Sequence, residues 1–252
     1  MPIFETESLV LKSYNLAEAD RIVVFLTRDF GIVRGVAKGA KRLKSRFGSM
    51  LEPFSTVTLE YFQKEDRELV GIRHIDLIDS RFERASEPEI LHTFSYLADL
   101  LVSFVPPHDP NETLYRMAKA CIDADSRSPE DIAAIRLYFE LWLLRLGGYL
   151  PDWNVCNTCK RALESDESAD VQADFHLLCG SCRKTRGANV LSGAHREAYR
   201  SALKLPPSEF MVTATGNLDV FNDVSTVLRR IISSVLGREL VGEKTFAVNS
   251  LQ

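Results

Sequence analysis

The stretch from Phe139 to Arg186 contains two cysteine pairs, Cys156-Asn157-Thr158-Cys159 and Cys179-Gly180-Ser181-Cys182, separated by 19 residues. Two such pairs at this spacing are typical of a structural zinc site, because each pair supplies two thiolates from a tight turn and together they complete a tetrahedron. A redox dithiol needs only one pair, so the second pair disfavours that alternative. The sequence therefore predicts one structural Zn²⁺, with four ligands: Cys156, Cys159, Cys179 and Cys182.

Length and composition leave room for several domains, since 45% of the 252 residues are hydrophobic. No apolar run is long enough to span a membrane, and the N-terminus lacks the pattern of a signal peptide. We therefore expect a cytoplasmic protein that does not associate with membranes. Only Cys121 lies outside the two pairs, which favours reduced thiols on a metal over a disulfide framework.

The first eighty residues alternate polar and apolar side chains with the period of β-strands. Five short strands are predicted, at about 9–14, 22–26, 32–37, 57–61 and 69–78. No long helix lies between them, and a five-stranded OB-fold barrel best fits their number and length.

A basic segment lies within this predicted barrel. From Phe30 to Leu51 there is no acidic residue and there are six basic ones: Arg34, Lys38, Lys41, Arg42, Lys44 and Arg46. Because the net charge of the chain is −4, a polyanion can be attracted only to such a local patch. We predict that the six residues contact DNA phosphates, the alternative being a solvated loop. Phe47 and Phe54 are possible stacking platforms, or else members of the core.

The region from 86 to 150 has helical periodicity, with helices predicted at about 90–104, 110–123 and 129–147. Ser86 and Glu89 have the spacing of a capping box, while Asp109-Pro110 and Ser128-Pro129 each place a cap before a proline at the first helical position. The last helix is apolar nearly all round, so we expect it at the centre of a bundle.

Two more helices are predicted after the cysteine pairs. One begins at Ser192 and is closed by Pro206-Pro207; the other starts near Asp219, ends at Gly237 and carries Arg229 and Arg230 away from its apolar stripe. Helices on both sides of the cysteine pairs are expected to form one bundle. Between the pairs lies an acidic loop, predicted to be a mobile hairpin tip, and basic residues flank the thiolates: Lys160, Arg161, Arg183, Lys184 and Arg186. Those cations could moderate the thiolate charge or contact DNA.

The predicted chain is an α+β multidomain protein, in which an N-terminal OB-fold barrel is followed by an α-helical domain with an inserted zinc ribbon. The predicted segments are 1–80 for a DNA-binding barrel, 81–150 and 189–252 for the two parts of the helical domain, and 151–188 for the ribbon. Motifs of nucleotide-binding loops and metalloproteases are absent from the sequence. Asp76 and Asp79 could hold magnesium at a strand end, although a solvated strand end is the expected reading.

Three parts of the chain resemble the bacterial RecO family of recombination mediators. They are Glu18-Ala19-Asp20-Arg21 through Leu26-Thr27 to Gly31; Val36 to Lys41 with Ser45-Arg46-Phe47; and Phe139-Glu140-Leu141, Leu144, Gly147-Gly148 and Pro151 with the first cysteine pair. The resemblance implies a protein without enzymatic activity or small-molecule substrate that binds single- and double-stranded DNA and anneals complementary strands. It also implies help in loading recombinase onto strands coated with single-stranded DNA-binding protein, in the bacterial cytoplasm at the nucleoid.

The partners implied by the resemblance are RecR and the single-stranded DNA-binding protein. Lys38, Lys41 and Arg46 align with the family's basic barrel loop, and the four paired cysteines with its zinc quartet. Two other classes of function are possible from the residues: a zinc-braced nuclease, and a protein-interaction adaptor that does not contact DNA.

Overall fold

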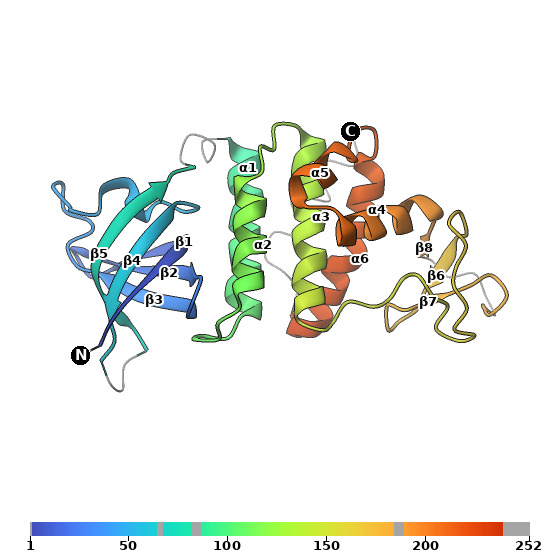
Figure 1. The fold of residues 1–252 in the computed structure, drawn as a ribbon, viewed down its shortest axis with the longest axis horizontal. Helices are drawn as coiled ribbons and strands as arrows, with labels where there is room; N and C mark the ends of the chain where they lie inside the picture. Colours follow the sequence, from blue (N-terminus) through green and yellow to red (C-terminus); the bar gives the residue numbers. More distant parts are fainter. Residues whose placement is uncertain (1, 65–67, 82–86, 184–188, 239–252) are drawn as a thin grey trace. The chain divides into compact units, whose positions relative to one another are not determined.

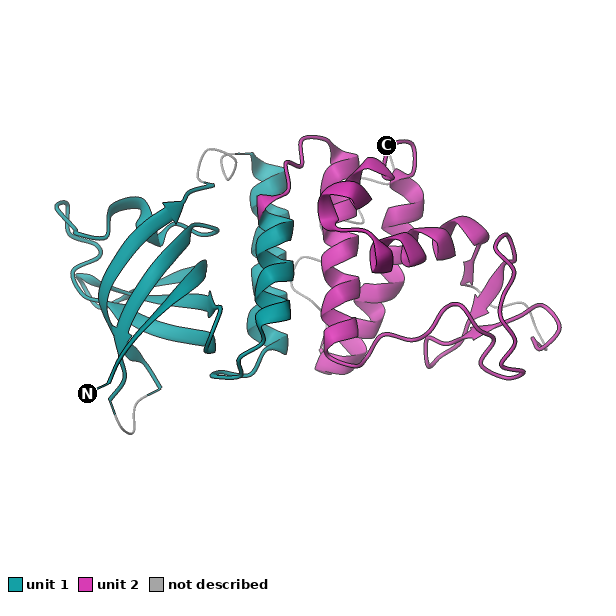
Figure 2. Cartoon of the chain, viewed as in Figure 1, with its two compact units in different colours: residues 1–122 teal, residues 123–252 magenta. Residues whose placement is uncertain are grey.

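The structure of the protein is a computed structural model that describes residues 2–64, 68–81, 87–183 and 189–238. The chain divides into two compact units, Met1–Ile122 and Asp123–Gln252, which Figure 2 shows in different colours. The finer division at residues 80, 150 and 188 stays a prediction. Among the described helices, none combines the length and the apolar character needed to cross a membrane.

The first unit begins with the predicted five-stranded barrel, which is closed (Figure 1). Its strands are β1 (Ile3–Leu16), β2 (Asp20–Thr27), β3 (Gly31–Ala37), β4 (Thr56–Phe62) and β5 (Val70–Asp79). They follow the order β1-β2-β3-β5-β4, in which only the β3–β5 pairing is parallel. The long β1 pairs with both β2 and β4, with an irregularity between Val10 and Lys12 where it turns from one partner to the other. The OB-fold prediction is confirmed.

Both aromatic residues considered as stacking platforms are buried. Phe47 is 1% exposed inside the barrel core, because the short helix η1 (Gly48–Leu51) covers the barrel end and turns both Phe47 and Leu51 inward. Phe54 is 2% exposed, and its ring centroid lies 5.2 Å from that of Phe94. Neither ring is available to a nucleic-acid base, so the platform hypothesis is wrong for both residues.

Two helices, α1 (Pro88–Phe104) and α2 (Glu112–Asp123), complete the first unit. Ion pairs join them to the barrel: Lys12 pairs with Asp99 on α1, and Arg28 lies 2.6 Å from Glu112 on α2. Four apolar residues of β1, β2 and β3 are also buried, and their removal from water stabilises this unit: Leu9, Leu11, Leu26 and Ile32.

The starts of both helices differ from the prediction. The N-cap of α1 is Glu87, with no side-chain capping bond, and Ser86 lies outside the described residues. Asn111 caps α2, because its Oδ1 accepts from the Leu114 N–H at 2.9 Å. Asp109-Pro110 cannot open the helix, since residues 107 to 109 are held against β3: His108 donates its N–H to the Ile32 carbonyl oxygen.

The second unit contains a bundle around the helix predicted to be central. Its helices are α3 (Pro129–Leu146), α4 (Gly193–Lys204), α5 (Pro207–Val212) and α6 (Leu218–Leu236), and α3 contacts the other three. Ser128 caps the start of α3, as predicted, and Asp131 completes a capping box with it. The short α5 was not predicted; Pro207 opens it instead of only ending α4.

A polar seam crosses the contact between α3 and α6. Arg136 donates to Asn222 Oδ1 at 2.6 Å, and Ser225 donates to the fully buried Glu140. Arg229, predicted on the exposed side of α6, is also buried. Because buried polar groups require hydrogen-bond partners, such a seam favours one register of the two helices over others.

Gly31 provides a test of how the barrel and the segment before α2 fit together. Its φ is +66°, and a Cβ there would lie 2.3 Å from the Asp109 carbonyl oxygen; Gly48 has φ +45° with open space around it. Gly48→Ala should therefore lose only about 1 kcal/mol of stability from backbone strain. Gly31→Ala adds the clash and should lose about 3 kcal/mol or more. Urea unfolding followed by circular dichroism measures both; equal losses would contradict this packing.

Candidate metal centre and basic barrel loop

The cysteine pairs lie in a small ribbon inserted between α3 and α4. Its sheet has the order β7-β6-β8, from β6 (Ala169–Val171), β7 (Leu177–Leu178) and β8 (Val190–Leu191). Each pair occupies a tight turn: Lys160 donates its N–H to the Cys156 carbonyl at 2.9 Å, and Cys182 to the Cys179 carbonyl at 3.1 Å. Asn157 N–H donates to the Leu177 carbonyl at 2.7 Å, which brings the turns together.

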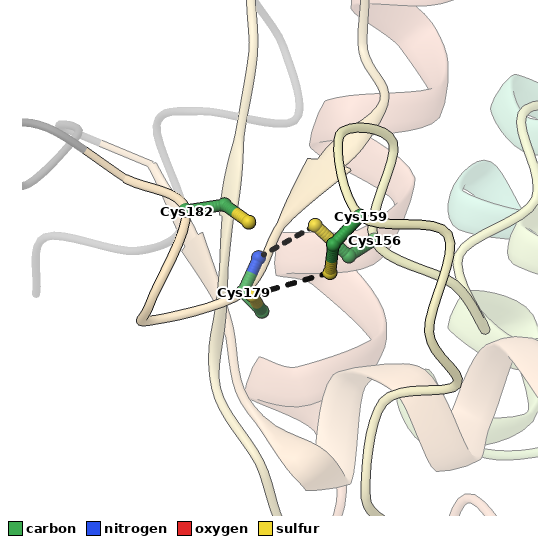
Figure 3. Close-up of side chains that lie close together, drawn as sticks. All are labelled: Cys156, Cys159, Cys179 and Cys182. Carbon is green, nitrogen blue, oxygen red and sulfur yellow. Dashed lines mark hydrogen bonds between the residues drawn. The ribbon is translucent and has the colours of Figure 1, made fainter.

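The four sulfur atoms converge as the sequence predicted (Figure 3). All four lie within 4.8 Å of one another, and Sγ of Cys159 is 4.0 Å from Sγ of Cys179. A tetrahedral zinc with Zn–S bonds of about 2.3 Å holds its sulfurs about 3.8 Å apart, so the quartet fits a metal ion of this kind. Cys156 and Cys179 are buried, whereas Cys159 is exposed at the rim.

Local hydrogen bonding prepares the quartet for a cation. Burial raises the pKa of Cys156, but backbone N–H donors from Cys179, Cys159 and Thr158 outweigh burial and lower it to about 6. Hydrogen bonds to Cys179 and Cys159 raise the pKa of Cys182 to about 12. Thiols this close cannot all ionise alone, because like charges repel; a bound divalent cation removes that conflict.

Two of the acidic residues between the pairs, Glu167 and Asp170, form ion pairs within the ribbon, and the mobile hairpin tip stays a prediction. Glu167 pairs with Arg161 through both carboxylate oxygens. Asp170 is fully buried in β6 and accepts from Arg183 at 2.9 Å. Arg161 and Arg183 are therefore paired with acidic residues inside the ribbon, and their predicted effect on the thiolates or on DNA stays a prediction. Lys184 and Arg186 lie outside the described residues.

Side chains that sequence reasoning missed hold the ribbon against α4. The guanidinium of the fully buried Arg196 donates to the carbonyl oxygens of Glu164 and Glu167. Tyr199 donates its hydroxyl to the Pro151 carbonyl at 2.9 Å, and its ring centroid lies 5.0 Å from that of buried Trp153. No spacing signal marks these residues, since each contact joins segments far apart in the chain.

The basic residues predicted to contact DNA lie on β3 and on the barrel loop that follows it, and all six are exposed. Lys41 N–H donates to the Ala19 carbonyl at 2.9 Å, and Gly39 N–H to Asp20 Oδ1 at 2.8 Å, so the turn between β1 and β2 anchors the loop. Within the described part of the chain, none of the six forms an ion pair, unlike Arg28 or Arg73. Their positive charge is therefore available to an anion.

Two family models together match most of the chain. The model described as Recombination protein O N terminal matches residues 1–81, and the model described as Recombination protein O C terminal matches residues 86–242.

Curated relatives give the same result, and the following three are each named DNA repair protein RecO. The Koribacter versatilis protein is 32% identical over 174 residues, which cover 69% of this chain and 68% of the relative. The Geobacter metallireducens protein is 30% identical over 185 residues, 73% of this chain and 74% of the relative. The Clostridium acetobutylicum protein is 26% identical over 234 residues, 92% of each.

Cys121 should be chemically inert, in contrast to Cys159. It is fully buried on α2, and burial raises the pKa of its thiol well above the ordinary value. A raised pKa keeps the thiol protonated, so its alkylation should stay slow from about pH 7 to about pH 9 in the native protein. Mass spectrometry after iodoacetamide treatment in a chelator measures this, with Cys159 and a urea-unfolded sample as positive controls. Native labelling of Cys121 at the rate of a free thiol would contradict it.

Proposed function

The chain belongs to the Recombination protein O (RecO) family of DNA repair proteins, and from this premise we propose that it is a recombination mediator that acts by binding DNA. The observation that carries the proposal is the anchored barrel loop, on which exposed cations gather without acidic partners. Phosphates that bind there would release condensed counterions, which drives association independently of base sequence. Such binding suits both single- and double-stranded DNA, because both present phosphates.

The proposed activity extends to annealing and loading. Cations that neutralise the phosphates of two complementary strands reduce the repulsion that opposes their pairing. We propose that the chain anneals strands in this way and helps load recombinase onto strands coated with single-stranded DNA-binding protein, with that protein and RecR as partners. Annealing of coated complementary strands, measured with and without RecR, tests this part of the proposal.

One Zn²⁺ is the proposed metal of the ribbon, bound by Cys156, Cys159, Cys179 and Cys182. The convergence of four sulfur atoms supports it, since thiolates in a tetrahedral set favour zinc. Four protein ligands would leave no open position for water, so the proposed role is structural. Bound metal would hold the two turns together, and its binding free energy would stabilise the folded ribbon.

A nuclease would need a different kind of site. Among the described residues, the cysteine quartet is the one cluster of three or more side chains that could hold a metal ion. Incubation of end-labelled DNA with the protein and added magnesium separates the two functions. Intact DNA is expected for a mediator. A cleavage activity that co-purifies with the protein would favour the nuclease and contradict the proposal.

The zinc proposal predicts coupled loss of metal and stability. Purified protein should contain about one zinc per chain, and Cys159→Ser should bind less zinc and melt at a lower temperature. Cys121→Ser, at a cysteine outside the quartet, is the matched control and should keep its zinc. Elemental analysis and thermal melting measure the two effects. A zinc-free parent, or a Cys159→Ser variant with the melting temperature of the parent, would refute a structural zinc.

The basic loop predicts a characteristic salt dependence. On single strands, log affinity should fall with log salt by about 0.7 per phosphate contact. Replacing Lys38, Lys41 and Arg46 with alanine should weaken binding to many sequences alike and flatten the slope by about two units. Because these side chains are exposed, the fold should survive.

The control variant removes three exposed cations elsewhere: Arg116, Arg127 and Lys204. Both triple variants have the same net charge, so a difference between them reports the position of the charge and not its total. Binding of a mixed-sequence strand across a salt series is the measurement. Equal slopes for the parent and the loop variant would place the DNA-binding surface elsewhere, and would favour the adaptor function if the parent showed no salt dependence.

A further inference from the structure

Two apolar side chains are exposed in this part of the barrel, one in the basic loop and one on β1, whose following turn anchors that loop. Leu43, between Arg42 and Lys44, is fully exposed, and Tyr14 on β1 is 50% exposed. An isolated exposed apolar residue is common on protein surfaces, but here one of the two is flanked by cations without ion pairs, and the other lies on the hairpin that anchors their loop.

Tyr14 belongs to a row of apolar residues on the outer face of the barrel. It lies directly opposite Ile22 on β2, and Ile22 lies opposite Val36 on β3. Directly opposed residues on neighbouring strands share a face of the sheet. Val23 points into the barrel core, so Ile22 points outward, and with it Tyr14 and Val36. All three are at least partly exposed, which makes the row a shallow apolar strip that spans three strands.

Cations border this strip. Arg34 lies two residues before Val36, so it shares the outer face and is exposed. The basic loop leaves the end of the same strand and is anchored at the β1–β2 hairpin, by Ala19 in the turn and by the carboxylate of Asp20 at the start of β2, which accepts from Gly39. The strip therefore lies on the same hairpin that holds the loop, and an anionic chain bound to the loop would have its apolar parts beside Tyr14.

We propose that Tyr14 and Leu43 contact the bases of unpaired nucleotides whose phosphates are bound by the basic loop. This inference rests on the proposed function and adds to it a preference for single strands. A flat aromatic ring beside cations is the combination that binds single-stranded nucleic acid, because every base offers a face for stacking. In a duplex the bases are stacked and paired, so only the phosphates would reach this surface.

Abasic DNA separates base contacts from phosphate contacts. The dissociation constants of three probes are compared: a mixed-sequence single strand, an abasic strand of the same length, and the duplex. The parent should bind the normal strand at least about 5-fold more tightly than the abasic strand. The double variant Tyr14→Ala with Leu43→Ser should lose most of this difference while its affinity for the abasic strand and the duplex stays unchanged. Tyr14→Phe keeps the ring and should behave as the parent.

The second unit offers matched controls, since Tyr149 is 51% exposed and Val212 is 76% exposed. The double variant Tyr149→Ala with Val212→Ser should keep the preference for normal strands. Equal binding of normal and abasic strands by the parent, or an unchanged preference in a folded Tyr14 and Leu43 variant, would overturn the inference. A loss of equal size on all three probes would also overturn it, because it would indicate a general effect on the surface.

The proposed function and this inference fail in different ways. If the variant of Lys38, Lys41 and Arg46 binds the abasic strand as the parent does, the phosphate surface lies elsewhere and the proposed function of the loop fails. If that variant is weakened but Tyr14 and Leu43 have no effect on the ratio of normal to abasic binding, only the base contacts fail. A parent that binds phosphatidylserine vesicles through Tyr14 and Leu43, without base dependence on DNA, would assign the face to a membrane surface and overturn the inference.

Discussion

Closure of the five-stranded sheet is the constraint on which the exposed basic loop of this protein depends. β1 must reach both β2 and β4, and β3 must meet β5 in the parallel direction before the sheet can close. The chain between β3 and β4 then has to cross the end of the barrel. Because the barrel interior must be filled, Phe47 and Leu51 turn inward, and the cations between them and β3 are left in water.

The cations of this protein differ in whether an acidic side chain pairs with them, and only those without such a partner keep a positive charge that could attract an anion. Arg161 and Arg183 in the ribbon are satisfied by Glu167 and by the buried Asp170, so their charge contributes to the ribbon itself. The barrel loop has no acidic residue of its own, and the nearby Asp20 carboxylate is already hydrogen-bonded to its backbone. A chain with a net charge of −4 can therefore present a positive surface without being basic overall.

Two different kinds of interaction stabilise the ribbon. Inside it, four sulfur atoms meet at distances that suit a metal ion. Outside it, the guanidinium of Arg196 and the rings of Trp153 and Tyr199 join it to α4. Loss of a metal would thus loosen the turns without removing the contacts with the helix, since those contacts use backbone carbonyls and buried rings.

The sequence by itself determined the features that depend on neighbouring residues: the five strands, most of the helices, the cysteine quartet and the basic loop, because period and spacing are local properties. Only the tertiary structure decided the burial of Phe47, the start of α2 after the cap Asn111, the acidic partners of the ribbon arginines and the exposure of Tyr14 on β1. Each of these depends on which distant segments meet, because packing determines whether a side chain is exposed to solvent and which residues it contacts.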